Sequence, residues 1–341
     1  MTKYLIALLL YCSIAGAAHA QWQPQAVNTD ASFRSVDMAG TDVIWIGGTK
    51  GTYVRSADGG KTWQTGTVPD AQTCDFRDVK AFDAQTAILM SAGPAEQGQA
   101  RLYKTTDGGQ TWTTLYQTQQ KGVFFDGIAF WDKEHGIVFS DPIDGRWFIL
   151  TTADGGQSWQ PVPAAALPAM TPGEAAFAAS GTSLTVQGKR NVWIASGGGT
   201  ASRVFRSTDR GQTWSVATAP LPSGEATGLF GMHFFNEKNG VAVGGNYKQE
   251  KQPGPNVVIT RDGGQNWTQL TPAVPAGLKE AVALLPGDRL LVVGPSGTGI
   301  SADQGQTWQQ LDTDGHHSLA CVKGTCYAVG AKGKVSKQVF K

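Results

Sequence analysis

Short apolar runs that end in small residues recur along the whole chain. Three examples are VIWIGG at 43–48, VWIASGG at 192–198 and GVAVGG at 240–245. The seven runs begin at residues 43, 87, 136, 192, 240, 289 and 326. Apolar runs of this kind, bounded by glycine, predict short buried strands, and no long stretch has the period of an amphipathic helix. The pattern therefore predicts an all-β protein.

A polar repeat follows each of the first six apolar runs. Its pattern is Ser/Thr-x-Asp-x-Gly-x-Thr-Trp, with Ser158 and Asn266 in place of the second Thr in two copies. Successive copies are 41 to 55 residues apart. The aspartates and tryptophans are Asp58, Asp107, Asp154, Asp209, Asp262, Asp303, Trp63, Trp112, Trp159, Trp214, Trp267 and Trp308. A repeat of this length that carries several short strands is typical of propeller blades.

The seventh apolar run has no such repeat after it. The segment QWQPQAV at 21–27 is similar to the sequence after the other repeats, for example SWQPVPA at 158–164. We therefore expect an N-terminal strand to complete the seventh blade, which would remove the open sheet edges. The prediction is one domain, residues 21–341, that forms a closed seven-bladed β-propeller.

The repeated aspartates are expected to be structural. A short carboxylate in a hairpin turn can accept backbone N–H groups, and the glycines beyond it permit positive φ. Each following tryptophan can bury roughly 150–250 Å² between blades. A calcium site or a catalytic role is the alternative, but one carboxylate per blade cannot converge on a single ion. We expect neither a metal nor a cofactor.

The N-terminal segment MTKYLIALLLYCSIAGAAHA has one lysine, an apolar stretch and a small-x-small site. This pattern predicts a signal peptide at residues 1–20, cleaved after Ala20, and a periplasmic or secreted product. The stretch is shorter than the ~20 apolar residues of a membrane span. Cys12 raises the alternative of a lipoprotein, but bulky Tyr11 precedes it.

Charge and cysteine content narrow the function classes. Once Lys3 leaves with the signal peptide, 27 basic residues remain against 27 acidic ones, without a long charged block. This balance does not favour nucleic acid or an anionic membrane as the partner. Cys321 and Cys326 flank a Lys-Gly turn, so we expect a disulfide there, whereas Cys74 stands alone. No Cys and His cluster has zinc-ligand spacing.

The polar repeats resemble the Asp-box repeats of bacterial sialidases, sortilin-type receptors, xyloglucanases and photosystem II stability/assembly factors. The resemblance covers nearly the whole mature chain, and the even blades and T-x-DGG-x-TW boxes are most similar to the assembly factors. These relatives include hydrolases, receptors and chaperones, so the motif implies the fold and not one activity. The resemblance to assembly factors implies a non-catalytic role in binding a protein or a membrane-complex subunit.

A glycan-directed glycoside hydrolase is the alternative. SFRSV at 32–36 resembles the sialidase Phe-Arg-Ile-Pro element but lacks its proline, and DFRDV at 75–79 repeats the Phe-Arg pair one blade later. A sialidase-like site needs three arginines around the substrate carboxylate, together with an Asp and a Tyr-Glu pair. A xyloglucanase-like site needs two carboxylates across the sugar, for which Asp126 and Glu280 are candidates.

The first residues of the innermost strands should form a ring at the mouth of the central channel. Alignment of these strands places there Arg34, Arg77, Asp126, Phe230, Glu280 and His317. Arg34 and Arg77 lie on adjacent blades and could hold one carboxylate or phosphate. The ring could equally satisfy itself by Arg–Asp and Glu–His pairs.

Long loops of blades two to five should open on the same face as this ring. Long loops on one side of a rigid scaffold commonly carry recognition, although surface loops also accept insertions without function. The candidate contacts in these loops are Asp141, Arg146, Glu174, Arg203, Tyr247 and Lys248. We expect this loop-rich face to bind a protein partner, with a glycan as the alternative ligand.

Overall fold

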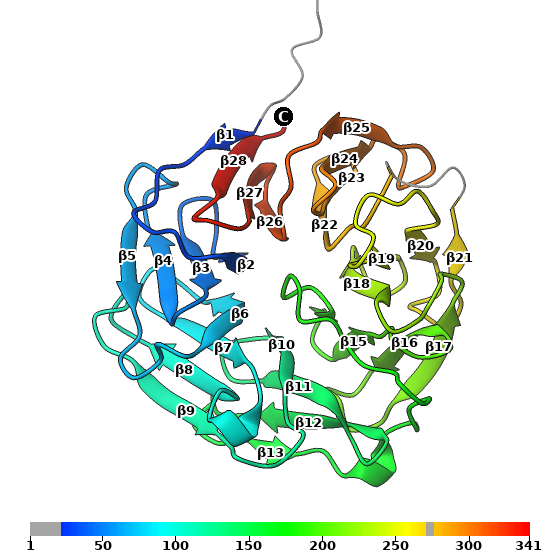
Figure 1. Ribbon diagram of the computed structural model, residues 1–341, viewed down its shortest axis with the longest axis horizontal. Coiled ribbons are helices and arrows are strands. Elements are labelled where there is room, and N and C mark those ends of the chain that lie inside the picture. The colour runs from blue at the N-terminus through cyan, green and yellow to red at the C-terminus, as the bar shows by residue number, and fades with distance from the viewer. Residues whose placement is uncertain (1–21, 271–275) are drawn as a thin grey trace, which may run out of the picture.

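The computed structural model describes residues 22–270 and 276–341. Within these ranges, 28 strands form seven four-stranded sheets that are arranged as blades in a closed ring (Figure 1). This architecture confirms the prediction of a seven-bladed, all-β propeller. The predicted signal peptide lies outside the described residues.

Each blade is an antiparallel meander that begins at the centre of the ring and ends at its rim. From the innermost strand outward, the blades are β2 (Phe33–Met38), β3 (Ile44–Gly48), β4 (Thr52–Ser56), β5 (Gln64–Thr67); β6 (Asp75–Ala81), β7 (Ala87–Ala92), β8 (Arg101–Thr105), β9 (Thr113–Gln117); β10 (Phe125–Phe130), β11 (Gly136–Ile143), β12 (Arg146–Thr152), β13 (Gln160–Pro161); β14 (Leu184–Gln187), β15 (Asn191–Ala195), β16 (Ser202–Ser207), β17 (Ser215–Ala219); β18 (Thr227–Phe234), β19 (Gly240–Asn246), β20 (Val257–Thr260), β21 (Thr268–Gln269); β22 (Ala281–Leu285), β23 (Arg289–Val293), β24 (Thr298–Ser301), β25 (Gln309–Asp312); and β26 (Ser318–Val322), β27 (Thr325–Val329), β28 (Val335–Val339), β1 (Gln23–Pro24).

The N-terminal strand closes the ring, as predicted. In blade 7, β1 pairs with β28 through Gln23 opposite Lys337 and Pro24 opposite Ser336. Trp22 adds a contact across the closure, because its indole N–H donates to Thr298 Oγ1 of blade 6 at 2.9 Å. The two ends of the chain therefore protect each other's sheet edge, which would otherwise be open to intermolecular pairing.

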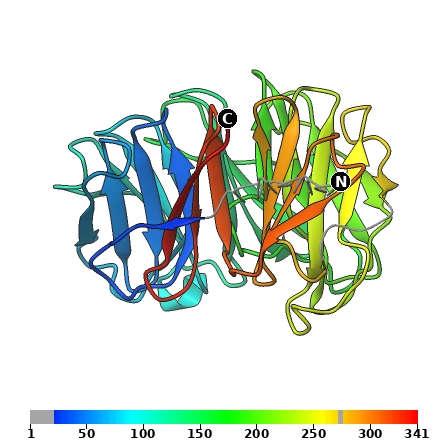
Figure 2. The ribbon, with the colours of Figure 1, turned by 90° about the horizontal axis from the view of Figure 1, so that it is seen from above.

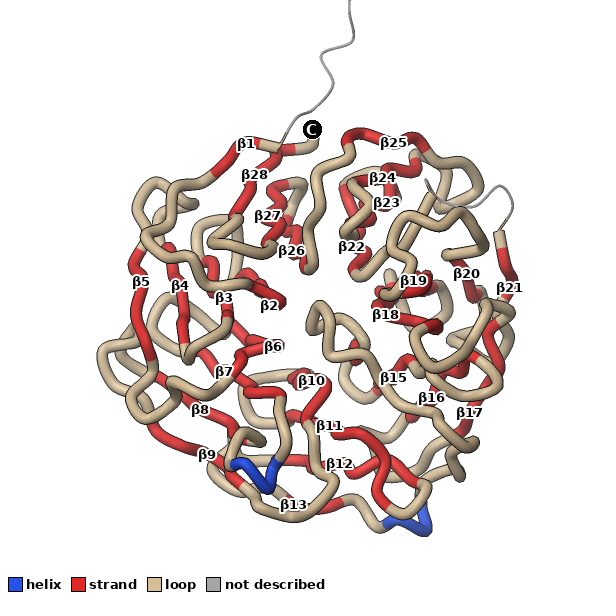
Figure 3. Tube along the Cα trace, viewed as in Figure 1, coloured by secondary structure: helices blue, strands red, loops and turns tan. Residues whose placement is uncertain are grey.

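The strands run between the two faces of a thick disc, which Figure 2 shows edge-on. The innermost strand of a blade starts on one face, here called the mouth face. Because each blade is an antiparallel meander, the turn after its third strand lies on the opposite face, here called the Asp-box face. Besides the strands, the described chain contains two single-turn 3-10 helices, η1 (Ala95–Gln97) and η2 (Ala164–Ala166), coloured blue in Figure 3.

The six Asp-box turns are built from the same local hydrogen bonds. In the second box, Thr105 Oγ1 donates to Asp107 Oδ1 at 2.9 Å and accepts the N–H of Gly109 at 2.9 Å. The N–H of Thr111 donates to Asp107 Oδ1, and its hydroxyl donates to Oδ2 at 2.6 Å. These bonds lower the pKa of Asp107 to about 2, mainly through the Thr111 hydroxyl. Each carboxylate is therefore occupied within its own turn.

The box tryptophans are less deeply buried than the sequence predicts. Trp159 and Trp267 are buried, whereas Trp63, Trp112, Trp214 and Trp308 are only half-buried. These side chains follow the outer part of each blade, where one ring face stays near solvent. The deepest aromatic packing comes instead from strand residues such as Trp45, Trp147 and Trp193, which are fully buried.

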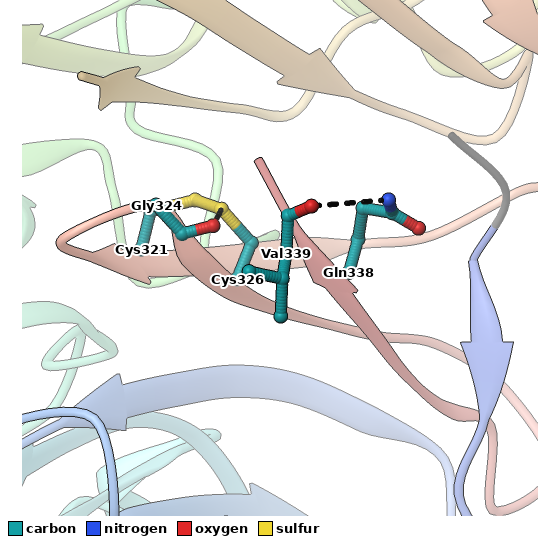
Figure 4. The surroundings of a disulfide bond; sticks show 5 residues. All are labelled: Cys321, Gly324, Cys326, Gln338 and Val339. Carbon is teal, nitrogen blue, oxygen red and sulfur yellow. Dashed lines mark hydrogen bonds between the residues drawn. A yellow bond between two sulfur atoms is a disulfide. The ribbon is translucent and has the colours of Figure 1, made fainter. Parts of the chain in front are cut away.

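Cys321 and Cys326 form a disulfide across the hairpin of β26 and β27 (Figure 4). The two residues are directly opposite each other in the strand register. The bridge therefore lies within blade 7 and ties one hairpin rather than two blades. Cys74 is a free, buried thiol that packs in the interface between blades 1 and 2.

Candidate functional site

A pocket of about 440 Å³ opens at the mouth of the central channel. We call it the mouth pocket. It contains all five charged residues that the sequence placed in the ring, together with Asp141 and Tyr247 from the predicted loop face. Its lining is Arg34, Arg77, Phe124, Asp126, Asp141, Ala176, Phe177, Ala178, Ala179, Phe230, Tyr247, Glu250, Glu280 and His317.

Four of the ring residues occupy the same irregularity of the innermost strand. The register shifts between Phe33 and Ser35 in blade 1, and equivalent shifts flank Arg77, Asp126 and Phe230 in blades 2, 3 and 5. A β-bulge leaves one residue without an opposite partner and redirects its side chain. The bulges therefore place one side chain of different chemistry per blade at the channel mouth.

The two arginines of the pocket differ in how far they are already bonded. Arg77 donates from Nε to Asp75 Oδ2 at 2.8 Å and from a terminal nitrogen to the carbonyl of Ala178 at 3.4 Å. Arg34 is half-buried and has no hydrogen bond or ion pair to any residue of the described chain. The guanidinium of Arg34 is thus free to bind an incoming carboxylate.

Two carboxyl groups lie next to the arginines. Asp126 is 1% exposed, and its Oδ2 is buried without a hydrogen-bond partner among the described residues. Burial raises the pKa of Asp126 well above its usual value, and the charge of Asp141 raises it further. Burial also raises the pKa of Asp141 to about 6, although the N–H of Ala176 donates to its carboxylate at 3.3 Å. Both groups hold a proton more tightly than the box aspartates.

Opposite this half of the ring, Glu280 and His317 satisfy each other. His317 Nδ1 lies 2.7 Å from Glu280 Oε2, and both side chains are largely buried. This is the Glu–His pairing that the sequence left as one of two outcomes for the ring. The ring is therefore partly self-paired, with Arg34 and Asp126 as its unsatisfied members.

An aromatic wall lies between the charged parts of the pocket. The rings of Phe177 and Phe230 stack at 4.2 Å between centroids, and Tyr247 meets Phe177 edge-on at 5.8 Å. Tyr247 is 43% exposed, which is unusual for a large aromatic side chain in this protein. Sequence reasoning missed Phe177, whose only signal was its place among small residues in GEAAFAASG. The wall gives the pocket an apolar surface beside Arg34 and Arg77.

The remaining predicted loop residues do not line the mouth pocket. Glu174 and Arg203 form an ion pair in which Arg203 Nε donates to Glu174 Oε1 at 2.9 Å, and the Glu174 side chain is fully buried. Ser196 and Thr171 donate to the same carboxylate. Arg203 is the principal partner that lowers the pKa of Glu174 against the effect of burial. This network holds the segment that carries Phe177.

Two other loop residues lie outside the pocket. Arg146 donates to the carbonyl of Leu167, and Lys248 forms an exposed ion pair with Glu225 at 2.8 Å. Lys248 directly follows Tyr247, so it borders the aromatic wall. Sequence alone could not separate these residues from those that line the pocket, because the distinction depends on loop conformation.

The channel below the mouth pocket has a second cavity of about 500 Å³ toward the Asp-box face. Asp78 lines it and accepts the N–H groups of Val79 and Ile128, both at 2.8 Å. Lys80 also lines it and pairs with Asp37 at 2.7 Å. In the described ranges, no group of three or more His, Cys, Asp or Glu side chains is placed to hold a metal ion.

Comparison with known proteins agrees with the repeat pattern. The model of the BNR/Asp-box repeat family matches residues 205–216. Photosystem II assembly lipoprotein Ycf48 from a Picosynechococcus species is 22% identical over 289 residues, which is 72% of this chain and 76% of that protein. The chain is thus an Asp-box propeller that resembles a photosystem II assembly factor.

Similar solved structures include proteins of different activity. A structure of YCF48 bound to D1 peptide has a TM-score of 0.68 and 20% identity, covering 94% of this chain and 97% of the other. Virginiamycin B lyase from Staphylococcus aureus has a TM-score of 0.67 and 11% identity, covering 94% of this chain and all (100%) of the other. At these identities the similarity shows the fold, which is shared by a binding protein and an enzyme.

The only helices of the described chain are the two short 3-10 turns, and neither has the length or apolar character needed to cross a membrane.

Proposed function

We propose that the protein is an exported, non-catalytic binding factor that takes a segment of a partner protein in the mouth pocket during assembly of a larger complex. The observation that carries this proposal is the combination of an unpaired arginine, Arg34, with an exposed aromatic wall in one pocket. Such a surface suits a peptide segment, because a peptide offers both carboxylate and apolar groups.

The geometry of the pocket suggests how the segment binds. Arg34 and the terminal nitrogens of Arg77 receive an acidic side chain or a C-terminal carboxylate. An apolar side chain of the segment packs on Phe177 and Tyr247, whose rings offer rigid contact area. The loop residues Arg146 and Lys248 extend the contact surface beyond the pocket. The peptide bound to YCF48, and the assembly role in the name of the Picosynechococcus protein, support this function.

Export is part of the proposal. Residues 1–20 act as a signal peptide, and the Cys321–Cys326 disulfide suits an oxidising compartment such as the periplasm. N-terminal sequencing of the purified mature protein tests the cleavage site. A first residue of Gln21 agrees with the proposal, whereas an intact Met1 contradicts it.

Affinity capture tests the binding site. The wild type and an Arg34→Ala, Arg77→Ala double variant are each used as bait in a periplasmic extract. The expected result is a specific partner that the wild type retains and the double variant loses. A Lys61→Ala, Lys133→Ala variant removes two cations from the Asp-box face and should keep the partner. Identical partner profiles for all three baits would defeat the proposed site.

A glycoside hydrolase is the second candidate function, and it is favoured by Asp126 and Asp141. Two neighbouring carboxyl groups with raised pKa values are the groups that an acid–base mechanism needs. Release of reducing sugar from xyloglucan, or of sialic acid from sialyllactose, measures this activity directly. Turnover that disappears in Asp126→Asn would favour the hydrolase, and its absence in the wild type would reject it for these substrates.

A further inference from the structure

Four blades carry a cation at the same place on their third strand. Arg55, Lys104, Arg206 and Lys337 each lie opposite the second-strand residue that corresponds to Trp45. In three of them the cation binds a backbone carbonyl of the next blade. The acceptors are the carbonyls of Ala84 for Arg55 at 2.6 Å, Gly155 for Lys104 at 2.9 Å and Gly59 for Lys337 at 2.7 Å. The cation thus normally fastens one blade to its neighbour.

Arg206 in blade 4 departs from this arrangement. Its side chain makes no hydrogen bond or ion pair within residues 22–270 and 276–341, and its Nε is buried without a partner. The corresponding carbonyl, that of Gly263, accepts the indole N–H of Trp193 at 2.8 Å instead. A buried N–H without an acceptor is costly, so this position calls for a ligand that can accept it.

Aromatic packing explains why the two arginines differ. In blade 1, the guanidinium of Arg55 lies over the ring of Trp45 at 5.4 Å. In blade 4, the equivalent Trp193 stacks face to face with Phe234 at 3.6 Å. The residue of blade 2 that corresponds to Phe234 is Ala81, which leaves the face of Trp45 open to Arg55. Arg206 is therefore displaced from both of the contacts that hold Arg55.

The displaced side chain borders a cavity of about 620 Å³ on the Asp-box face, between blades 4 and 5. Three further cations line this cavity, namely Lys189, Arg190 and Lys238. Two acids, Glu237 and Asp262, also line it. The Asp262 carboxylate is occupied in its own box, where it accepts the N–H and side-chain amide of Asn266 at 2.9 and 2.7 Å. The cavity therefore has a surplus of positive charge with one acidic group engaged elsewhere.

We propose that this cavity is a binding site for a phosphate group, with Arg206 as its central ligand. The guanidinium fork matches two phosphate oxygens, and the surrounding lysines and Arg190 add charge-assisted contacts. The volume also accommodates a small organic group attached to the phosphate. A soluble phosphoester and a phospholipid headgroup offer the same chemistry. This site lies on the face opposite the mouth pocket, so it is independent of the proposed peptide binding.

Side-chain NMR of the full mature protein tests the site. The probe is inorganic phosphate, titrated into protein labelled with ¹⁵N-arginine, and the readout is the Nε–H signal of each arginine. We expect the Arg206 signal to shift in a saturable way. Arg206→Gln should weaken phosphate binding by about tenfold or more, because the charge-assisted bonds are lost.

Arg55→Gln is the matched control, since it removes the same group from the same strand position in blade 1. It should leave phosphate affinity unchanged. Melting curves establish that both variants are folded. An unchanged Arg206 signal at saturating phosphate, or equal weakening by Arg206→Gln and Arg55→Gln, would overturn the proposal.

Vesicle flotation distinguishes the two sources of phosphate. Vesicles of phosphatidylglycerol in phosphatidylcholine are compared with vesicles of phosphatidylcholine alone. Flotation that requires phosphatidylglycerol and is lost in Arg206→Gln assigns the site to a lipid headgroup. Binding of inorganic phosphate without such flotation assigns it to a soluble phosphoester.

Discussion

The two faces of the propeller use aspartate in opposite ways. On the Asp-box face, six carboxylates repeat the same bonds, and donors in each turn lower their pKa values, as for Asp107. On the mouth face, Asp126 and Asp141 are placed by different elements, and burial raises their pKa values. Positions that repeat from blade to blade satisfy themselves, whereas positions that break the repeat are left with unsatisfied groups. The difference teaches that a binding site in a repeat protein is found where the repeat fails.

The largest expected effect separates the two faces within one blade. Trp267 follows the fifth Asp box, is 7% exposed and packs edge-on against Phe234. Trp267→Ala should lower the free energy of unfolding by about 3–5 kcal/mol, as expected for a buried aromatic side chain. Tyr247→Ala, on the mouth face of the same blade, should change it by less than about 0.5 kcal/mol. Chemical denaturation measures both, and equal losses would erase the distinction.

The next effect concerns Asp141, whose folded-state pKa of about 6 lies above the model value of 3.8. The folded protein holds this proton more tightly than the unfolded chain does, so ionisation lowers stability as pH rises from about 4 to 6. Asp141→Asn removes the charge and retains an oxygen for the Ala176 N–H. The variant should be more stable than wild type by about 1–3 kcal/mol near pH 7 and similar near pH 4. A loss of stability near neutral pH would contradict the assigned burial effect.

The disulfide should have a smaller effect, because it closes a short loop within one hairpin. Cys321→Ala with Cys326→Ala should lower the free energy of unfolding by about 2 kcal/mol or less. Denaturation of the wild type with a reductant should reproduce this loss, and the reductant should not change the double variant. A much larger loss would mean that the bridge supports the closure of the ring and not only its own hairpin.

The smallest effect is expected for a single exposed box carboxylate. The folded-state pKa of Asp107 is depressed to about 2, so its contribution is present above the unfolded pKa and is lost as pH falls toward 2. Asp107→Asn should lower the melting temperature slightly at neutral pH and flatten its fall between about pH 4 and 2. This pH dependence has the opposite sign to that of Asp141. The same sign for both residues would refute the contrast between the faces.

The fold could be predicted from sequence because each blade carries its own signal. Seven apolar runs, six boxes and the similarity of QWQPQAV to post-box segments were enough to predict the blade number and the closure. These signals are local, so they do not depend on how distant segments meet. The burial of the box tryptophans was overestimated, since sequence does not show how far the outer strands stand from the core.

The candidate site could be predicted only in part. Alignment of the innermost strands identified Arg34 and Asp126, because equivalent bulges place them alike. It could not show that Arg34 lacks a partner in the described chain, nor that Glu174 and Arg203 pair with each other. The stacking of Phe177 on Phe230 joins segments from two blades, and Arg206 becomes unusual only when compared with Arg55 in three dimensions.

Site-specific photo-crosslinking tests the central claim, that the mouth face is the binding surface, most directly. A photoreactive phenylalanine analogue replaces Tyr247 in the mouth pocket or, in the control, Val339, which is 52% exposed on the last strand of blade 7. We expect a crosslinked partner from the Tyr247 position, lost when Arg34→Ala and Arg77→Ala are added, and none from Val339. A partner that crosslinks from Val339 and not from Tyr247 would contradict the account.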